Sequence, residues 1–271
     1  MSTRDPRLET AFKEFAIETA RQAGKILLEH HGRPFAPTWK GMSDFKTAAD
    51  DASDAYICRE VKQAFPALRL FSEETGVRTS SAGYEVVVDP LDGTIPFSTG
   101  ISDLWAVCIA LCYECRPVVG ITFAPLRDRG CGELFVAQDG SGAFLNGREI
   151  YVSAEAEITH VRIGLDPGKA PGRLRLNAIE AKLDADDGVN CILRHGCASV
   201  PMALVAAGRL NAYAAIGFDP FSLAVGALLI PEAGGRFSTL AGEDWKLDDQ
   251  SCLGANPSLH ANLLTVFGTR W

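Results

Sequence analysis

The amino-acid sequence predicts a layered α/β protein, and three features of its apolar pattern indicate this. Helical periodicity covers much of the first 65 residues. Short apolar runs typical of strands follow, between about residues 85 and 145. After about residue 155, predicted strands and helices alternate, which is the pattern of an α/β unit. We therefore expect an N-terminal α+β half, residues 1–155, and a C-terminal α/β half, residues 156–271.

Two helices are predicted before the first long strand. In residues 8–31 apolar side chains recur every three or four positions, and Gly32 ends the pattern. A second helix is predicted over residues 50–65, and Pro66 stops it.

Shorter patterns predict the remaining elements. The run Val86-Val87-Val88 lies in a buried strand over residues 85–89. The other expected strands are 105–112, 117–123, 133–137, 142–145, 160–164, 189–194 and 211–215, and the other expected helices are 172–183, 197–207 and 220–233.

Composition excludes several classes of function. Apolar residues make up 47% of the chain and charged residues 22%, as in an ordinary globular protein. The net charge of −8 disfavours general nucleic-acid binding, which needs a basic face. No apolar run approaches the ~18 residues of a membrane span, and the N-terminus lacks an apolar signal core. We expect no nucleic-acid partner and no membrane.

Eight cysteines raise the question of disulfides or zinc. A chain of this size and apolar content does not need disulfide staples. Cys112 and Cys115 form a C-x-x-C, but no second pair or histidine cluster accompanies it. The alternation around the pair is typical of a strand, so buried thiols are favoured over zinc. These observations predict a reducing, cytoplasmic location.

The stretch Asp89-Pro90-Leu91-Asp92-Gly93-Thr94 carries the most chemistry. The valine strand delivers Asp89 to its end, and a Pro-Leu turn can direct Asp92 to the same centre. Two adjacent carboxylates repel unless a cation lies between them, and hard oxygen ligands suit Mg²⁺. If a helix begins there, the N–H groups of Gly93 and Thr94 can hold a phosphate. A capped turn without metal is the alternative.

Two further acidic elements precede this stretch. Glu73 and Glu74 follow an apolar run at the end of a predicted strand, where acidic pairs are usually solvated surface. Asp50 opens a predicted helix, where an acidic residue is usually a cap or a first-turn charge.

Taken in order, these elements resemble the inositol monophosphatase family of lithium-sensitive, Mg²⁺-dependent phosphatases. The resemblance covers nearly the whole chain. It is carried by Asp44 to Asp50 (D-x-x-T-x-x-D), Ser72-Glu73-Glu74, the signature Asp89 to Thr94, Gly120 to Pro125, Asp139 to Ala143, Asn146-Gly147, Gly196-Cys197-Ala198 and Glu232-Ala233-Gly234-Gly235.

The resemblance implies an α-β-α-β-α sandwich, a homodimer and hydrolysis of a small phosphate monoester with two or three Mg²⁺ ions. One cation would activate water and another would neutralise the leaving oxygen. By position, the implied metal ligands are Glu73, Asp89, the carbonyl of Leu91, and Asp92. Thr94, with Asp50 behind it, would orient the attacking water. The implied substrate contacts are Asp92, Gly93, Thr94, Cys197 and Ala198. Lys40 is either a positive charge near the site or an exposed lysine beside a helix.

The sequence departs from the family where a further metal ligand is expected. Ser222 stands at the position of an aspartate, and a neutral hydroxyl cannot compensate cation charge as a carboxylate does. We therefore expect the second metal to bind more weakly. Asp219 lies three residues earlier and has two interpretations. It is either the N-cap before Pro220 or a substitute metal ligand.

Two more departures concern the substrate. Ala215 replaces the glutamate that contacts inositol in the family, and Pro96 replaces an asparagine. These changes argue against inositol phosphate and leave histidinol phosphate, sugar phosphates and nucleotide 3′-phosphates open. Ser222 also leaves a second function open, that of a catalytically weakened phosphatase-like protein acting as a binding or regulatory subunit.

Overall fold

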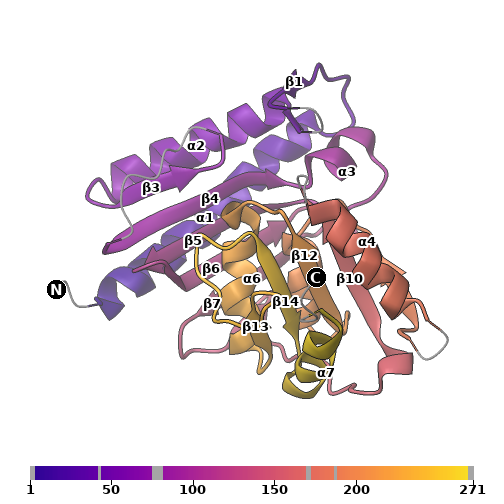
Figure 1. Ribbon diagram of the computed structural model, residues 1–271. Helices are drawn as coiled ribbons and strands as arrows, with labels where there is room; N and C mark the ends of the chain where they lie inside the picture. The colour runs from indigo at the N-terminus through magenta and orange to yellow at the C-terminus, as the bar shows by residue number, and fades with distance from the viewer. Residues whose placement is uncertain (1–3, 42–43, 75–81, 169–171, 186–187, 268–271) are drawn as a thin grey trace.

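The protein is built from five layers, three of helices and two of β-sheet (Figure 1). The computed structural model describes residues 4–41, 44–74, 82–168, 172–185 and 188–267. In these layers, helices α1 and α2 cover one face of a large sheet, α5 and α6 lie between the sheets, and α4 and α7 cover the outer face of a smaller sheet. The α-β-α-β-α sandwich implied by the sequence is confirmed.

The first layer consists of α1 (Pro6–His30) and α2 (Ala48–Ala64), which pack against each other. Asp5 caps α1 by accepting hydrogen bonds from the N–H groups of Arg7 and Leu8. Thr47 caps α2 in a reciprocal capping box, so Asp50 occupies the third helical position and does not open the helix. Asp50 is buried there.

The large sheet has seven strands in sequence order. All neighbours are antiparallel except the first pair, which is parallel. Its strands are β3 (Arg69–Ser72), β4 (Tyr84–Asp92), β5 (Ala106–Tyr113), β6 (Arg116–Ala124), β7 (Glu133–Gln138), β8 (Ala143–Leu145) and β9 (Arg148–Glu149). A short helix, α3 (Thr94–Thr99), follows β4 directly.

The small sheet has the order β11-β10-β12-β14-β13, in which β10 pairs in parallel with β11 and β12. The parallel pairs bring the carboxyl ends of β10 and β12 to one edge. Its strands are β10 (Arg162–Pro167), β11 (Cys191–Leu193), β12 (Ala212–Ile216), β13 (Arg236–Ser238) and β14 (Ser251–Ala255). The accompanying helices are α4 (Gly172–Leu183), α5 (Ser199–Ala206), α6 (Pro220–Glu232) and α7 (Pro257–Phe267), and the remaining elements are β1 (Thr38–Trp39), β2 (Phe45–Lys46) and the 3₁₀ turn η1 (Ile158–His160).

Three hydrophobic cores separate the layers. One lies between α1, α2 and the large sheet, and is filled by Phe12, Ile57 and Trp105 among others. The largest lies between the two sheets around α5 and α6, and the third lies under α4 and α7. Because the middle core draws on both sheets, the two predicted halves share buried surface. Their division at residue 155 stays a prediction.

Helix α6 connects the two sheets. It packs against β6 and β7 of the large sheet and against β13 and β14 of the small one. At its last residue the carboxylate of Glu232 accepts hydrogen bonds from the N–H groups of Gly140 and Gly142, at 2.8 and 2.6 Å. These two residues belong to the hairpin between β7 and β8. The helix is therefore fixed to the large sheet at its end as well as along its length.

Most of the long elements were predicted from the sequence, whereas the 11-residue helix α7 and most of the short elements were not. The predicted helix over 197–207 begins at Ser199, and the strand over 85–89 extends to Asp92. The elements without a predicted range are β1, β2, α3, β9, η1, β13, β14 and α7, and the strand expected before Glu73 and Glu74 is β3. Cys112 is buried on β5, whereas Cys115 is half-buried in the turn that follows.

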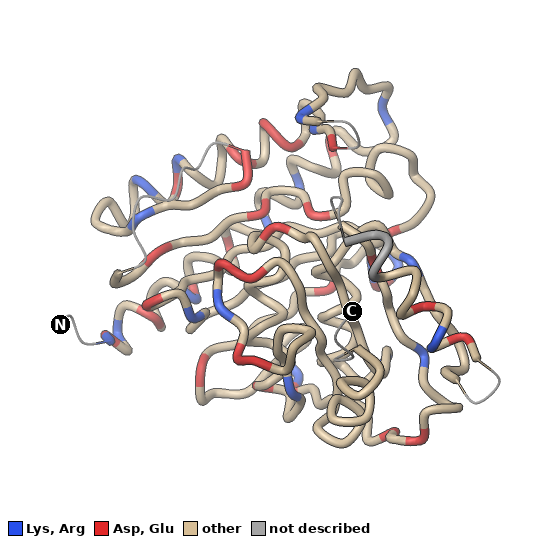
Figure 2. Tube along the Cα trace, viewed as in Figure 1, with Lys and Arg blue, Asp and Glu red and all other residues tan. Residues whose placement is uncertain are grey.

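Charges are distributed over the whole fold. Figure 2 shows acidic and basic residues interspersed along the described trace. No helix among the described residues is both long enough and apolar enough to cross a bilayer.

A buried histidine makes the stability of the fold sensitive to acid. His260 on α7 is fully buried, and its Nε2 lies 2.8 Å from the hydroxyl oxygen of Ser238. Burial, aided by the charge of Arg236, lowers the pKa of His260 to about 4. Between the ordinary value of 6.5 and about 4, the folded chain binds fewer protons than the unfolded chain. The contribution of His260 to stability is therefore lost as the pH falls through this window.

We expect the free energy of unfolding to fall by about 3 kcal/mol between pH 6.5 and pH 4 through His260, since one pKa unit corresponds to 1.36 kcal/mol. His260→Gln should remove this step, measured by urea denaturation across the window. His160→Gln is the control, because that side chain is 67% exposed. Equal acid sensitivity in the wild type and His260→Gln would contradict the prediction.

Candidate active site

The end of β4 places two carboxylates on one side of the sheet. Asp89 pairs with Cys108 on β5 and Asp92 pairs with Ala106, so three steps on β4 oppose two steps on β5. In a regular strand, residues three apart face opposite sides, and the bulge corrects this. The hydroxyl of Ser53 on α2 donates to the carbonyl oxygen of Pro90, which satisfies a backbone group within the bulge. The convergence arises from a β-bulge, whereas the sequence analysis expected a turn.

Asp92 is held by donors from the other half of the chain. Its Oδ2 accepts hydrogen bonds from the thiol of Cys197, the N–H of Ala198, and both the N–H and the hydroxyl of Ser199. The N–H donors lie at 3.0 and 2.6 Å. Burial nevertheless raises the pKa of Asp92 above its ordinary value.

Cys197 and Ala198, predicted as substrate contacts, therefore hold a carboxylate. Both are fully buried, and Gly196 is the residue of that turn that lines the pocket. Beside them, Gly93 adopts a φ of +90°, and a Cβ there would lie 2.7 Å from the carbonyl oxygen of Leu104. Glycine is therefore required where the chain turns from β4 into α3.

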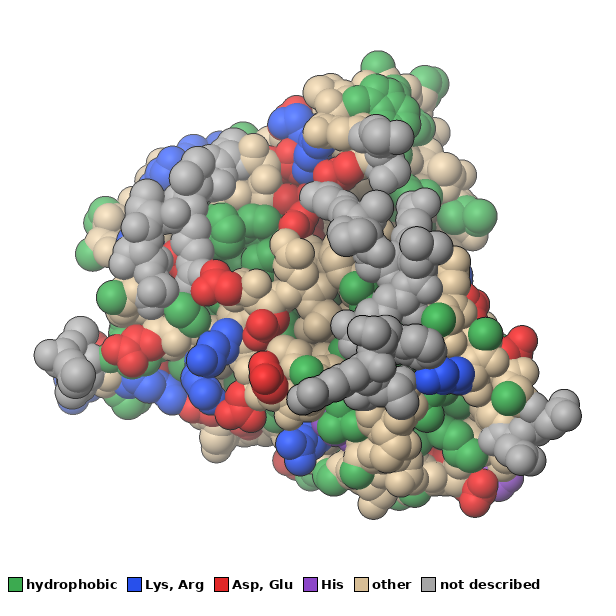
Figure 3. Space-filling model, in the orientation of Figure 1, with side chains coloured by type: hydrophobic (Ala, Val, Ile, Leu, Met, Phe, Trp, Pro, Cys, Tyr) green, Lys and Arg blue, Asp and Glu red, His purple; other side chains and the backbone are tan. Residues whose placement is uncertain are grey.

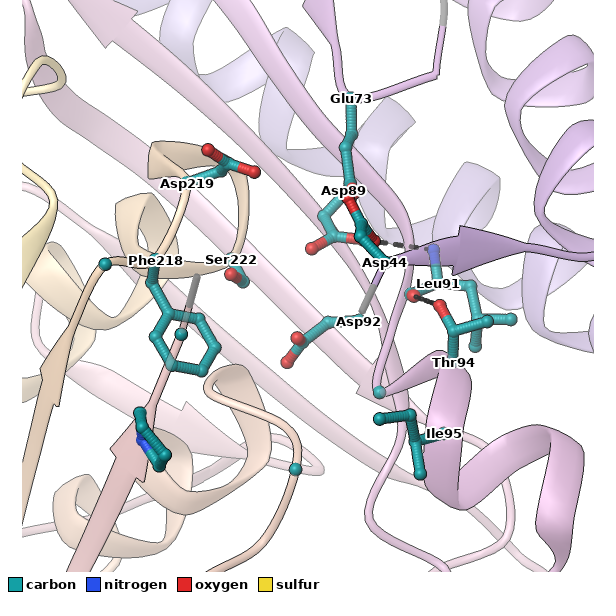
Figure 4. Close-up of a pocket in the computed structure, with 15 residues that line it drawn as sticks. Asp44, Glu73, Asp89, Leu91, Asp92, Thr94, Ile95, Phe218, Asp219 and Ser222 are labelled. Atoms are coloured by element: carbon teal, nitrogen blue, oxygen red, sulfur yellow. Dashed lines mark hydrogen bonds between the residues drawn. The ribbon is translucent and has the colours of Figure 1, made fainter. Parts of the chain in front are cut away.

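Glu73 points toward Asp89 on the same side of the pocket (Figure 4). Burial, followed by the negative charges of Glu73 and Asp92, raises the pKa of Asp89 well above its ordinary value. Burial raises the pKa of Glu73 to about 7, against the opposing charge of Lys40. Burial raises the pKa of all three carboxylates, and the charges of Glu73 and Asp92 add to the effect at Asp89, so the site has a local demand for positive charge.

Lys40 supplies positive charge at this place. Its Nζ lies 3.0 Å from Glu73 and 2.6 Å from Glu74, whose side chain is only 2% exposed. The sequence analysis treated Glu73 and Glu74 as ordinary solvated surface when taken alone, and Lys40 as an exposed lysine in one interpretation. In the structure the glutamates are paired with Lys40, which is an exposed residue and also lies near the site. In the space-filling view, acidic and basic side chains lie against each other in the upper part of this face (Figure 3).

Thr94 and Asp50 form a second hydrogen-bonded unit at the pocket. The hydroxyl of Thr94 lies 3.1 Å from Oδ1 of Asp50 and 3.3 Å from the carbonyl oxygen of Leu91. The other oxygen of Asp50 accepts from the N–H and hydroxyl of Thr47. Burial raises the pKa of Asp50, although these hydrogen bonds oppose it. The sequence-predicted pair is thus in contact, with Thr94 facing the pocket.

Asp219 and Ser222 form the wall opposite the carboxylates, at the start of α6 (Figure 4). Asp219 occupies the N-cap position before Pro220, but its side chain makes no capping hydrogen bond. Its charge contributes to the raised pKa of Glu73. The position predicted for a cap is therefore correct, and the capping bond is not made. The complete set of pocket-lining residues is Asp44, Glu73, Asp89, Leu91, Asp92, Gly93, Thr94, Ile95, Pro167, Gly168, Gly196, Gly217, Phe218, Asp219 and Ser222.

Asp166, a buried residue behind this pocket, was not among the residues predicted from the sequence. It lies at the end of β10, and its Oδ1 accepts hydrogen bonds from the N–H groups of His195 and Gly196 at 2.8 and 3.0 Å. Its Oδ2 lies 3.4 Å from Nδ1 of His195. The turn that Asp166 fixes continues directly into the donors of Asp92. An acidic residue inside an apolar strand pattern was the available signal.

The donor set fits a hard cation. Asp89, Asp92, Glu73 and the carbonyl of Leu91 offer oxygen ligands of the kind that Mg²⁺ prefers. Within the described part of the chain, no three acidic, cysteine or histidine side chains are close enough to form a ready-made metal cage. The side chain of Glu73 contacts Lys40, and that of Asp92 contacts its four donors. The carboxylates are therefore not gathered around one point.

Comparisons with known proteins identify the family. A model of the inositol monophosphatase family matches residues 9–270. The chain belongs to the inositol monophosphatase family. It is 32% identical to inositol monophosphatase 3 of Solanum lycopersicum over 257 residues, covering 92% of this chain and 93% of that protein. It is 30% identical to the putative Nus factor SuhB of Neisseria meningitidis serogroup B (strain ATCC BAA-335 / MC58), covering 97% and 98%.

Solved structures of the inositol monophosphatase family share the fold. The extragenic suppressor protein suhB of Bartonella henselae superimposes with a TM-score of 0.88 at 28% identity, covering 96% of this chain and 100% of that one. The Thermotoga maritima IMPase gives a TM-score of 0.83 at 25% identity, covering 94% and 95%. As a member of this family, the protein is a phosphoric monoester hydrolase.

Proposed function

We propose that the protein hydrolyses a small phosphorylated metabolite with Mg²⁺ and an activated water. The observation that carries the proposal is the bulge in β4, which directs Asp89 and Asp92 to one side and faces them with Glu73. Bound Mg²⁺ would lower the pKa of water and neutralise charge on the phosphate.

The residues of the chain then have distinct tasks. Asp89, Asp92, Glu73 and the carbonyl of Leu91 would hold the cation. Thr94 would orient the attacking water, because its hydroxyl is already fixed by Asp50 at 3.1 Å. Gly93 and Thr94 line the pocket beside Asp92, and we propose that they contact the phosphate. Cys197 and Ala198 contribute by keeping Asp92 in place.

We propose that Asp219 takes the place of the carboxylate that Ser222 lacks. It faces the same pocket, contributes charge toward Glu73, and makes no cap to α6. The second cation then depends on a ligand from the N-cap position of the helix. We expect it to bind more weakly than the first, because Ser222 offers no charge.

Asp219→Ala should weaken Mg²⁺ binding about fivefold, as loss of one ligand charge at a partly exposed site costs about 1 kcal/mol. Stability of the metal-free protein should change by less than about 0.5 kcal/mol, since no capping bond is lost. Asp5→Ala is the matched control. That carboxylate does cap a helix, so stability should fall by about 1 kcal/mol with Mg²⁺ binding unchanged. Calorimetric titration measures Mg²⁺ binding, and urea denaturation measures stability. If Asp219→Ala loses stability while Mg²⁺ binding is unchanged, Asp219 is a helix cap and not a metal ligand.

The substrate is proposed to differ from inositol phosphate. Ala215 is fully buried between β10 and β14 and offers no hydrogen-bond acceptor to a ring hydroxyl. Histidinol phosphate, sugar phosphates and nucleotide 3′-phosphates remain the proposed classes. Hydrolysis of an aryl phosphate with and without Mg²⁺ tests the reaction itself, and the absence of Mg²⁺-dependent turnover in folded protein would refute it.

A binding or regulatory role is the second candidate. Ser222 weakens the cage, and relatives with 30–33% identity are named Nus factor SuhB. Binding without turnover distinguishes this role. The homodimer and the cytoplasmic location implied by the resemblance are likewise proposals, and sedimentation of the purified chain tests the dimer.

A further inference from the structure

The wall of the pocket that faces Asp92 is built from the carboxyl ends of β10 and β12. Pro167 and Gly168 come from the first strand, and Gly217 and Phe218 follow the second. The two segments lie in close contact, because a Cβ on Gly168 would meet the carbonyl oxygen of Gly217 at 2.1 Å. Only glycine fits there, so the wall carries no side chain at this point.

Hydrogen-bond donors on this wall are already in use. The N–H of Gly168 donates to the carbonyl of Ile216 at 2.7 Å, and those of Gly217 and Phe218 donate to the carbonyl of Gln250. The N–H of Gly196 donates to Asp166. Pro167 has no N–H. The oxygen atoms of a polyol placed against these residues would therefore find no available N–H group among them.

The surface that the wall does offer is apolar. Phe218 is half-buried, and its ring lies along the pocket on the side facing Asp92 (Figure 4). Ile95 stands across from it at the start of α3 and is 51% exposed. No lysine or arginine is among the described residues that line the pocket.

We propose that residues 167, 168, 217 and 218 form a subsite for a flat aromatic group carried by the alcohol of a phosphate monoester. This subsite rests on the proposed phosphatase function and specifies its substrate class. The ring stacks on Phe218 while the phosphate lies at the carboxylates of β4. Stacking of two rings in a partly dry pocket favours such a substrate by about three- to tenfold over an equally long polyol.

The test compares 2-phenylethyl phosphate with glycerol 1-phosphate as substrates of the full chain with Mg²⁺. The wild type should have a kcat/KM several-fold higher for the phenyl compound, mainly through a lower KM. Phe218→Ala should reduce that ratio to about one. Phe218→Leu conserves most of the apolar volume, so it should fold normally and still lose most of the ratio. Tyr151→Ala is the control, because this tyrosine is 61% exposed and does not line the pocket.

A binding experiment separates this proposal from the proposed reaction. The phosphonates 3-phenylpropylphosphonate and 3,4-dihydroxybutylphosphonate replace the ester oxygen by carbon and cannot be hydrolysed. Calorimetry with Mg²⁺-loaded protein should show tighter binding of the phenyl compound, and loss of the difference in Phe218→Leu. If turnover fails but this difference appears, the subsite stands without the reaction. Equal binding of both phosphonates, or a difference that Phe218→Leu leaves intact, overturns the subsite even in an active enzyme.

Discussion

Asp89→Asn should lower kcat/KM for any phosphate monoester by about 10³, because several kcal/mol of charge stabilisation depend on the cation that Asp89 would hold. The metal-free protein should be at least as stable as the wild type. Asp89 is buried beside Glu73 and Asp92, and their repulsion raises its pKa. The amide has the same shape and no charge, so the repulsion is relieved.

Thermal unfolding with and without Mg²⁺ checks this result. Mg²⁺ should stabilise the wild type by preferential binding to the folded state, and the shift should be largely absent in Asp89→Asn. Asp244→Asn serves as the control, since that side chain is 79% exposed. An Asp89→Asn protein that keeps both Mg²⁺-dependent turnover and the thermal shift would rule out Asp89 as a ligand.

Asp166→Ala should have the second largest effect, about 10² in kcat/KM and about 2–4 kcal/mol in stability. The N–H groups of His195 and Gly196 lose their buried acceptor, and a hydrogen bond to a charged group contributes about 1.5–3 kcal/mol. The turn that loosens carries the donors of Asp92, so the carboxylate becomes less well placed. Asp166 is thus a positioning residue that acts through Asp92.

A conservative variant distinguishes positioning from folding. Asp166→Asn retains an oxygen for the two N–H groups and should recover most of the stability and activity, with kcat more affected than KM in both variants. Glu243→Ala provides a surface control, because that residue is exposed. Should Asp166→Ala lose stability while kcat is unchanged, the turn does not position Asp92.

Much of the fold followed from periodicity within single segments. The helical spacing of residues 8–31 and the valine run before Asp89 are local signals, and both elements formed as predicted. Short elements such as β13 and β14 were missed, because three to five residues carry little period and are stabilised by partners distant in sequence.

The individual residues of the site could be predicted from the sequence, but the contacts between them could not. Strand spacing alone cannot give the bulge at Asp89 and Asp92, since it depends on the register with β5. The role of Asp166 depends on β10 and β11 lying in parallel, which brings together residues 29 positions apart. The partners of Asp92 lie more than 100 residues away. Such contacts are properties of topology, and no local pattern records them.

Helix α6 packs between two parts of the pocket that belong to different sheets. The carboxylates belong to β4 in one sheet, and the wall of residues 167, 168, 217 and 218 belongs to the other, with α6 packed against both. A replacement of Phe218 changes the selective wall without altering the hydrogen bonds around Asp92. Replacements of Phe218 should therefore change the proposed subsite while Asp89 and Asp92 stay in place, whereas replacements of Asp219, on the same side of the pocket, should also change binding of the second cation.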